Sequence, residues 1–242
     1  MEKEILEYLN KLKDDTFKEF QKKLIITNSE IIGVKMNYLK DLAKSIVTSQ
    51  QTLELLPYGK YYEYDILNGL MISYQKVQTK EKLNNLLEFS YHIDNWSMCD
   101  ITVCSTKFKK QDYDLLFTFC QTLIKSDNPF VNRFGVIFML KYFSDIDSEI
   151  AYNLLSTLTY GNCYLDMGVA WFYSVALIKN FRDTLKAIIK IRNKSEFVYQ
   201  KSLQKAIESY RITDEQKVIL RNLKKVEKGC EDNVKFWILF TY

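Results

Sequence analysis

Residues Met36–Ile46 read MNYLKDLAKSI, and the spacing of their apolar side chains decides the fold class. Leu39, Ala43 and Ile46 recur at steps of three and four residues, the period that places side chains on one face of an α-helix. The same spacing appears on either side of this stretch, at Ile5, Leu6, Leu9 and Leu12 and at Ile66, Leu67, Leu70 and Met71. Strict alternation of apolar and polar residues, which marks a half-buried strand, is scarce. The sequence therefore predicts an all-α protein.

The composition agrees with this fold class. The 242 residues include only 7 Gly and 2 Pro, far below average usage, which argues against an all-β architecture with its many turns. Hydrophobic residues make up 47% of the chain, enough for a continuous core without covalent cross-links.

Short polar breaks separate the helical segments, and they fall at Thr27–Ser29, Pro57–Gly59, Ser126–Pro129 and Thr159–Asn162. Connections of this length join antiparallel helices. From about residue 60 the segments follow one another as pairs of similar length. We expect an α-solenoid of stacked antiparallel helix pairs with a concave face, formed by one domain over residues 1–242. A compact helical bundle is the alternative.

The charge balance does not by itself indicate a nucleic-acid-binding protein. The chain has 34 basic and 30 acidic residues, a formal net charge of +4. Basic residues nevertheless cluster locally, at Lys107, Lys109 and Lys110 and again at Lys217, Arg221, Lys224, Lys225 and Lys228. A cluster of this kind is most often a solvated helix face.

The cysteines do not point to a metal site or to a disulfide framework. There are five of them, Cys99, Cys104, Cys120, Cys163 and Cys230. They form no CxxC pair, and the single His92 cannot complete a zinc-ligand set with them at a recognised spacing. We therefore expect no metal, and nothing in the sequence calls for a cofactor.

No targeting or membrane-spanning segment is expected. The N-terminus is charged and has no apolar signal core, and no internal run approaches the length of a membrane span. The apolar run Phe236–Phe240 is too short to cross a bilayer, so we expect it to pack on a neighbouring helix or, alternatively, to contact a partner. These features favour a cytoplasmic protein. A solenoid with capped ends needs no partner, so we expect a monomer.

The segment His92–Asp100, HIDNWSMCD, holds the first functional candidates. Trp96 and Asp100 lie four residues apart in a helical pattern, so both project from one helix face. Asp94 or Asn95 is placed to cap this helix. An aromatic plane beside a carboxylate suits the binding of a sugar. The structural alternatives are a core position for Trp96 and an ion pair of Asp100 with Lys107 or Arg133.

Two later positions add to these candidates. The sequence Asp127-Asn128-Pro129 predicts a helix start and places Arg133 in the opening turn of that helix. An arginine among apolar residues needs a fixed partner, either a carboxylate or a phosphate. Trp171 lies in a strongly apolar helical segment, and composition alone favours a core position for it.

These residues, taken in order, resemble those of the AlkD-like DNA alkylation repair proteins, which are built from HEAT-like helical repeats. The matching positions are Gly33–Lys44, Tyr62–Tyr64, Asn95–Asp100, Arg133 and Ala170-Trp171. The resemblance covers roughly residues 20–225. One departure lies at Met167–Ser174, which lacks the basic residues that flank the second tryptophan in that family.

The resemblance implies a DNA glycosylase that hydrolyses the N-glycosidic bond of N3- or N7-alkylated purines in duplex DNA. It assigns the catalytic carboxylate to Asp100, the deoxyribose contacts to Trp96 and Trp171, and a phosphate contact to Arg133. Further candidate phosphate contacts are Lys107, Lys109, Lys110, Lys205 and Arg211. A cationic base needs no general acid to leave, which agrees with a site that has one acid and no histidine.

Two other functions remain open at this point. A noncatalytic HEAT-like protein with the same fold recognises bent or branched DNA through its phosphates. In a protein-binding helical scaffold, the same aromatic residues only pack in the hydrophobic core and the same basic residues only lie at its rim.

Overall fold

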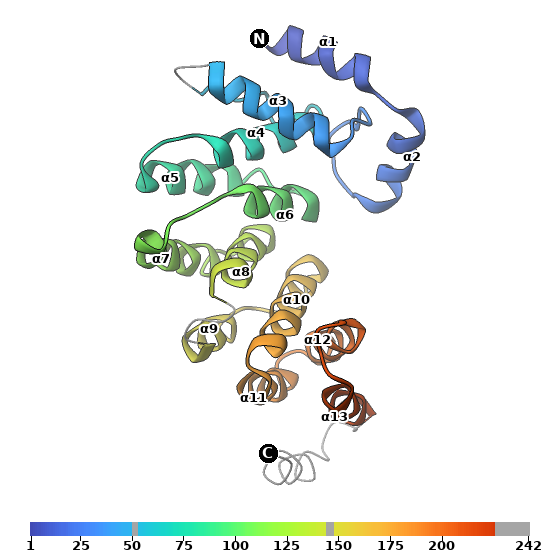
Figure 1. Cartoon of the computed structure of the whole chain (residues 1–242), viewed down its shortest axis with the longest axis vertical. Coiled ribbons are helices and arrows are strands. Elements are labelled where there is room, and N and C mark those ends of the chain that lie inside the picture. The colour runs from blue at the N-terminus through green and yellow to red at the C-terminus, as the bar shows by residue number, and fades with distance from the viewer. Residues whose placement is uncertain (50–52, 144–147, 226–242) are drawn as a thin grey trace. The chain divides into compact units, whose positions relative to one another are not determined.

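The computed structural model describes residues 1–49, 53–143 and 148–225. These residues form α-helices, one short 3-10 helix and no strand, which confirms the all-α prediction (Figure 1). The elements are α1 (Glu2–Leu12), α2 (Asp15–Leu24), α3 (Met36–Ser49), α4 (Tyr62–Tyr74), α5 (Thr79–Ser90), α6 (Trp96–Ser105), η1 (Lys110–Asp112), α7 (Tyr113–Ile124), α8 (Pro129–Phe143), α9 (Ser148–Leu155), α10 (Cys163–Lys179), α11 (Phe181–Arg192), α12 (Glu196–Glu208) and α13 (Asp214–Lys225).

The chain forms two compact units, and the division between them falls within α8, after Ile137. In the first unit α3 packs against α4, α4 against α5 and α6, and α5 against α7. In the second unit α10 packs against α11 and α12, and α12 packs against α13. Packing of each helix against its neighbours along the chain is the pattern of a helical-repeat solenoid, so the predicted fold class is confirmed. A single domain over residues 1–242 stays a prediction.

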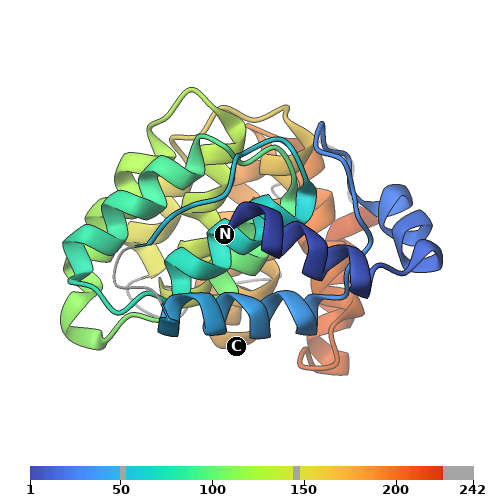
Figure 2. The same ribbon diagram turned by 90° about the horizontal axis from the view of Figure 1, so that it is seen from above.

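Helix α4 is the centre of the first unit. Every residue from Tyr62 to Ser73 is buried, because α3, α5 and α6 all pack on this helix. Its apolar residues accordingly do not keep to one stripe, as is normal for a helix covered on all sides. Seen from above in Figure 2, α1 lies over α3 and α4, and the hydroxyl of Tyr64 donates to the carbonyl of Glu2 at 3.4 Å.

Three buried or half-buried carboxylates hold the loop that leads into α3. Glu63 accepts hydrogen bonds from the backbone N–H groups of Ile32, Gly33 and Val34 at 2.9, 2.8 and 3.1 Å. Asp65 accepts from the hydroxyl of Ser29 and from the N–H of Gly59, and Asp94 accepts from the hydroxyl of Thr27 and the N–H of Asn28. A loop that carries buried N–H groups needs such acceptors, since it has no ladder or helix to satisfy them.

Gly33 is required by this loop for two reasons. Its φ of +101° is rare for residues with a side chain, and an added Cβ would lie 2.7 Å from the Cβ of Lys18 and 2.8 Å from the carbonyl oxygen of Asp14. We expect Gly33→Ala to lower the free energy of unfolding by about 2–3 kcal/mol, since strain and a clash act together. The matched control is Gly59→Ala, because Gly59 has a φ of +73° but nothing within 4 Å of the added Cβ. Urea unfolding of both variants checks this, and equal losses would contradict it.

Asp65 makes the stability depend on pH. Burial raises its pKa to about 6 from the ordinary 3.8, against the opposing hydrogen bonds from Ser29 and Gly59. The folded protein thus keeps this proton over a range where the unfolded chain has lost it. The resulting stability is fully present below about pH 4 and is lost as the pH rises through about 6, a change on the order of 2–3 kcal/mol.

The measurement is the difference in unfolding free energy between the wild type and Asp65→Asn at about pH 4.5 and pH 7. We expect the wild type to lose stability relative to the variant as the pH rises. A difference that stays constant over this range would contradict the prediction.

The predicted breaks and caps are largely confirmed. All four breaks fall between helices, and α8 begins at Pro129 with the side chain of Asn128 accepting from the N–H of Phe130 at 2.9 Å. The placement of Arg133 in the opening turn was wrong by one residue. Arg133 is the fifth residue of α8, and one helical turn takes only 3.6 residues, so it begins the second turn.

Several predictions concern residues that lie outside the described part of the chain. These are Cys230, Lys228 and the apolar run Phe236–Phe240. Among the described residues, Cys99, Cys104, Cys120 and Cys163 are free thiols. No helix in the described ranges is both long and apolar enough to cross a membrane.

Candidate functional site

The N-terminal half of α6 positions Trp96 and Asp100. Asn95 caps the helix, because its side-chain oxygen accepts from the N–H groups of Ser97 and Met98 at 3.0 and 3.1 Å. Of the two caps that the sequence allowed, the helix therefore uses Asn95, while Asp94 binds the loop before α3. Trp96 is the first residue of α6 and Asp100 lies one turn later, on the same side.

Trp96 is a surface residue of the first unit. Its side chain is 37% exposed, and its indole Nε1 donates to the carbonyl of Leu24 at the end of α2, at 3.1 Å. This hydrogen bond ties the polar edge of the ring to the protein. The indole is thus fixed in orientation and keeps an accessible surface, as a platform for a sugar requires.

Asp100 forms an ion pair with Arg133 of α8. The guanidinium nitrogen Nη2 of Arg133 lies 3.0 Å from Oδ1 and 2.9 Å from Oδ2 of Asp100. The Asp100 side chain is 16% exposed and that of Arg133 is 7% exposed. The two residues are 33 positions apart in the chain, so the pair also joins α6 to α8.

The ion pair gives Asp100 a defined chemical state and position. A guanidinium within hydrogen-bond distance favours the ionised carboxylate, and a largely buried pair is screened much less than a surface pair. A negative charge held at one place beside an exposed aromatic ring can stabilise a developing cation or orient a water molecule.

Cys99 lies next to Asp100 but is a poor nucleophile. Its side chain is fully buried, and burial together with the neighbouring charge of Asp100 raises the pKa of the thiol well above its ordinary value. The thiol therefore stays protonated at neutral pH, and only the thiolate is strongly nucleophilic. The carboxylate of Asp100 is therefore the stronger candidate for chemistry in this part of the protein.

Trp171 belongs to the second unit and is not sealed in its core. It is the ninth residue of α10 and is half-buried, whereas its neighbours Ala170 and Phe172 are fully buried.

The basic candidates are also divided between the two units. Lys107, Lys109 and Lys110 are exposed between α6 and α7 of the first unit, whereas Lys205, which is half-buried on α12, and Arg211, which is exposed, belong to the second unit.

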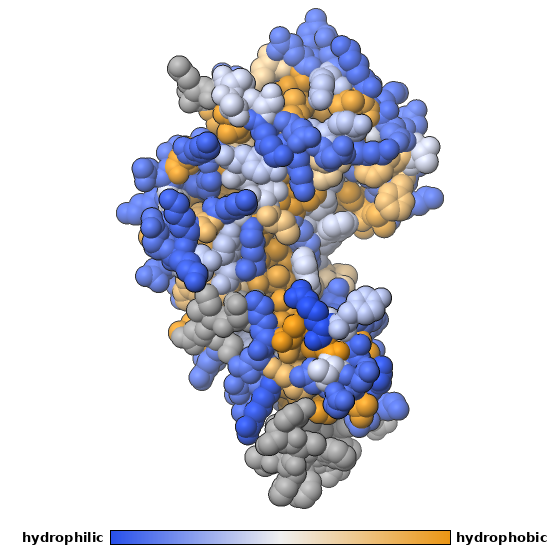
Figure 3. Space-filling view, viewed as in Figure 1, coloured by the Kyte–Doolittle hydropathy of each residue, from blue (hydrophilic) through white to orange (hydrophobic). Residues whose placement is uncertain are grey.

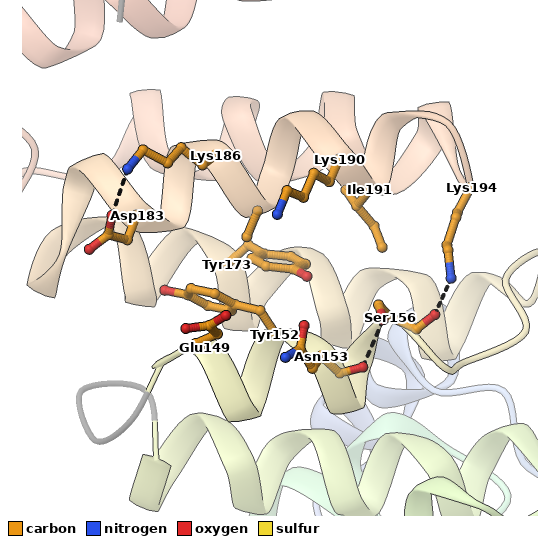
Figure 4. Close-up of a pocket in the computed structure, with 11 residues that line it drawn as sticks. Glu149, Tyr152, Asn153, Ser156, Tyr173, Asp183, Lys186, Lys190, Ile191 and Lys194 are labelled. Carbon is orange, nitrogen blue, oxygen red and sulfur yellow. Dashed lines mark hydrogen bonds and ion pairs between the residues drawn. The ribbon is translucent and has the colours of Figure 1, made fainter. Parts of the chain in front are cut away.

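A cavity of about 690 Å³ lies in the second unit among α9, α10 and α11 (Figure 4). Tyr152 and Tyr173 lie on one side of it with ring centroids 5.8 Å apart. Two of its lysines have partners within the cavity, since Lys186 pairs with Asp183 at 3.1 Å and Lys194 donates to the carbonyl of Ser156. Tyr173 lies two positions after Trp171 on α10, so the two side chains point to different faces. None of the predicted site residues lines this cavity.

Metal ligands do not gather in the part of the chain that the structure describes. No group of three or more His, Cys, Asp or Glu side chains within it is arranged to hold a metal ion. Sequence reasoning did not predict that Glu63, Asp65 and Asp94 act as acceptors for the loops, or that the backbone carbonyl of Leu24 fixes Trp96.

Comparison with known proteins gives one match. A family model described as DNA alkylation repair enzyme matches residues 5–220 of the 242. No curated protein and no solved structure matches the chain.

Proposed function

The chain belongs to the DNA alkylation repair enzyme family, and from this premise we propose that it is a DNA glycosylase for cationic, N3- or N7-alkylated purines. The observation that carries the proposal is the Asp100 carboxylate, fixed by Arg133 and one helical turn from the exposed indole of Trp96. The substrate is duplex DNA that contains an alkylated base.

The proposed reaction needs little from the protein beyond a fixed negative charge. An alkylated purine carries a positive charge and leaves as a neutral base with the electron pair of the C1′–N bond. The sugar gains oxocarbenium character as this bond breaks, and a water oxygen then bonds to C1′. Asp100 stabilises the cation and accepts the proton of the water, while the indole face of Trp96 contributes a further attraction for positive charge.

Arg133 acts in this proposal as a positioning residue for Asp100. Its guanidinium donates to both carboxylate oxygens and is itself almost fully buried, so it holds the acid against rotation. The phosphate contact that the family resemblance assigns to Arg133 stays a prediction. Trp171 is included as the second deoxyribose contact on the resemblance alone.

The leaving group provides the test of the proposed substrate class. We expect release of 7-methylguanine and 3-methyladenine, whose N-glycosidic bonds are activated by charge, and no release of uracil from an otherwise identical duplex. Free bases are separated and quantified by liquid chromatography. Release of uracil at a comparable rate would sink the proposal, since Asp100 offers no means to activate a neutral base.

The exposed lysines after α6 give a separate prediction on DNA affinity. We propose that Lys109 and Lys110 contact phosphates, so Lys109→Ala/Lys110→Ala should flatten the dependence of log K on log salt by about two units, at roughly 0.9 for each contact. The control is Lys3→Ala/Lys11→Ala on α1, which removes the same charge from exposed positions of the same unit. Filter binding to an undamaged duplex at several salt concentrations measures both slopes. Equal slopes for the two variants would contradict the assignment.

A noncatalytic DNA-binding function is favoured by one observation. The carboxylate of Asp100 already has a strong partner in Arg133, as a purely structural residue would. This reading predicts salt-sensitive duplex binding without release of any base.

A protein-binding scaffold is favoured by another observation. Apolar side chains gather on the surface over α2 (Figure 3), and Phe20, Leu24 and Ile26 are 55%, 50% and 78% exposed. A scaffold of this kind should show no salt-dependent affinity for duplex DNA.

A further inference from the structure

A second cavity, of about 890 Å³, lies in the first unit where the C-terminal parts of α3, α4 and α6 meet. Four lysines line it, Lys44 of α3, Lys76 before α5, Lys82 of α5 and Lys107 after α6. Among the described residues that line the cavity there is no aspartate or glutamate. Four separate segments of the chain thus bring positive charge to one concave place.

The negative partial charges at the helix ends offset only part of this positive charge. The C-terminal ends of three helices carry about −0.5 elementary charge each, which is far less than the charge of four ammonium groups. Lys82 interacts with the C-terminal end of α4, since its ammonium group donates a hydrogen bond to the carbonyl of Ser73 at 3.2 Å. Burial lowers the pKa of Lys82, which is the expected effect when an ammonium group is partly removed from water.

The other three lysines are not committed to strong partners. Lys44 pairs with Asp41 at 3.1 Å, but both side chains are more than half exposed, and such pairs contribute little. Lys76 and Lys107 are exposed and make no hydrogen bond or ion pair with any described residue. The described residues therefore leave a net positive charge in the cavity that is only weakly offset, by the pair of Lys44 with Asp41.

We propose that this cavity binds a phosphate-bearing anion. Its volume falls in the range of small-molecule sites, about 300–1,000 Å³, and lysine ammonium groups bind phosphate as point charges from several directions. The hydroxyls of Thr48 and Ser105, which also line the cavity, add neutral donors. A cationic alkylated base is repelled by such a site, so the cavity is separate in function from Asp100.

The phosphate groups bound in this cavity can belong either to a free di- or triphosphate compound or to the backbone of a DNA strand. Ser105 lies five residues beyond Asp100 on α6, a distance of about 7.5 Å along the helix axis at 1.5 Å per residue. Ser105 also lies about 140° around the helix from Asp100, so the DNA backbone is the source only if a strand that contacts Trp96 and Asp100 continues round this end of α6. The inference itself rests on the lysines and not on the proposed glycosylase activity.

The test uses the full chain and the variant Lys76→Gln/Lys107→Gln, whose two side chains have no partners to lose. Inorganic pyrophosphate is titrated into each protein by calorimetry at low salt, and binding to an undamaged duplex is measured separately. The matched control, Lys3→Gln/Lys11→Gln, removes two exposed charges from α1. We expect pyrophosphate to bind the cavity variant at least fivefold more weakly than it binds the control.

Each outcome discriminates. Loss of pyrophosphate affinity with unchanged duplex affinity supports the cavity as a site for a free phosphorylated compound. Loss of duplex affinity beyond that of the control supports the DNA backbone as the source. Equal behaviour of the two variants toward both pyrophosphate and duplex overturns the proposal, and none of these measurements requires base release.

Discussion

Asp100→Asn is expected to slow the release of 7-methylguanine by a factor of about 10² to 10³, the usual loss when one preorganised electrostatic group is removed from an active site. The asparagine has the same shape but no charge, so it cannot stabilise the oxocarbenium-like sugar or accept a proton from the attacking water. Affinity for undamaged duplex should stay within about twofold, because binding rests on phosphate contacts. Single-turnover rates and duplex titrations measure the two effects.

Two controls separate catalysis from stability. Removing one partner of a largely buried ion pair commonly costs about 3–5 kcal/mol, so the folded fraction of the variant is first checked by urea unfolding. Arg133→Gln breaks the same pair at 2.9–3.0 Å but keeps the carboxylate, so it should retain measurable base release. Asp114→Asn removes an exposed carboxylate from α7 and should behave as the wild type. Parallel loss of duplex binding and base release in Asp100→Asn would mean that Asp100 is structural.

Glu63→Ala is expected to produce a large loss of stability without touching the candidate site. The Glu63 side chain is fully buried and accepts three backbone N–H groups, those of Ile32, Gly33 and Val34. Each buried donor left without a partner costs about 1–3 kcal/mol, so the free energy of unfolding should fall by at least about 3 kcal/mol. Urea unfolding followed by circular dichroism measures this change.

Glu81→Ala provides the matched control for this prediction. Glu81 is exposed on α5 and makes no hydrogen bond or ion pair with a described residue, so its removal should change stability by less than about 0.5 kcal/mol. A loss below about 1 kcal/mol in Glu63→Ala would show that water or a rearranged loop replaces the carboxylate, contrary to the account given for this loop.

The local features of the fold were predictable because local rules decide them. The 3.6-residue period gave the helices, and polar residues before apolar runs gave the starts of α6 and α8 at Asn95 and Asn128. The breaks at Pro57–Gly59 and Thr159–Asn162 follow from the preference of proline, glycine and asparagine for turns. Each of these features depends on residues within a few positions of one another.

The long-range contacts were not predictable in the same way. The hydrogen bonds of Glu63 and Asp94 span 29 to 67 residues, and no spacing rule connects a carboxylate on one helix with the N–H groups of a distant loop. For Asp100 the sequence left two ion-pair partners and a free carboxylate open, and only the placement of α8 beside α6 selects Arg133. The lysine cavity was not predicted either. Its four lysines come from different segments of the chain, and in the sequence only Lys107 belongs to a visible cluster of basic residues, the one after α6.

If this protein hydrolyses the N-glycosidic bond of cationic alkylpurines, the wild-type protein must release free 7-methylguanine from methylated duplex DNA, and this release is the decisive measurement. We expect 7-methylguanine to accumulate with time and enzyme concentration, well above spontaneous depurination of the same duplex. No release above that background, with salt-sensitive duplex binding intact, would contradict the glycosylase and leave a noncatalytic DNA-binding protein.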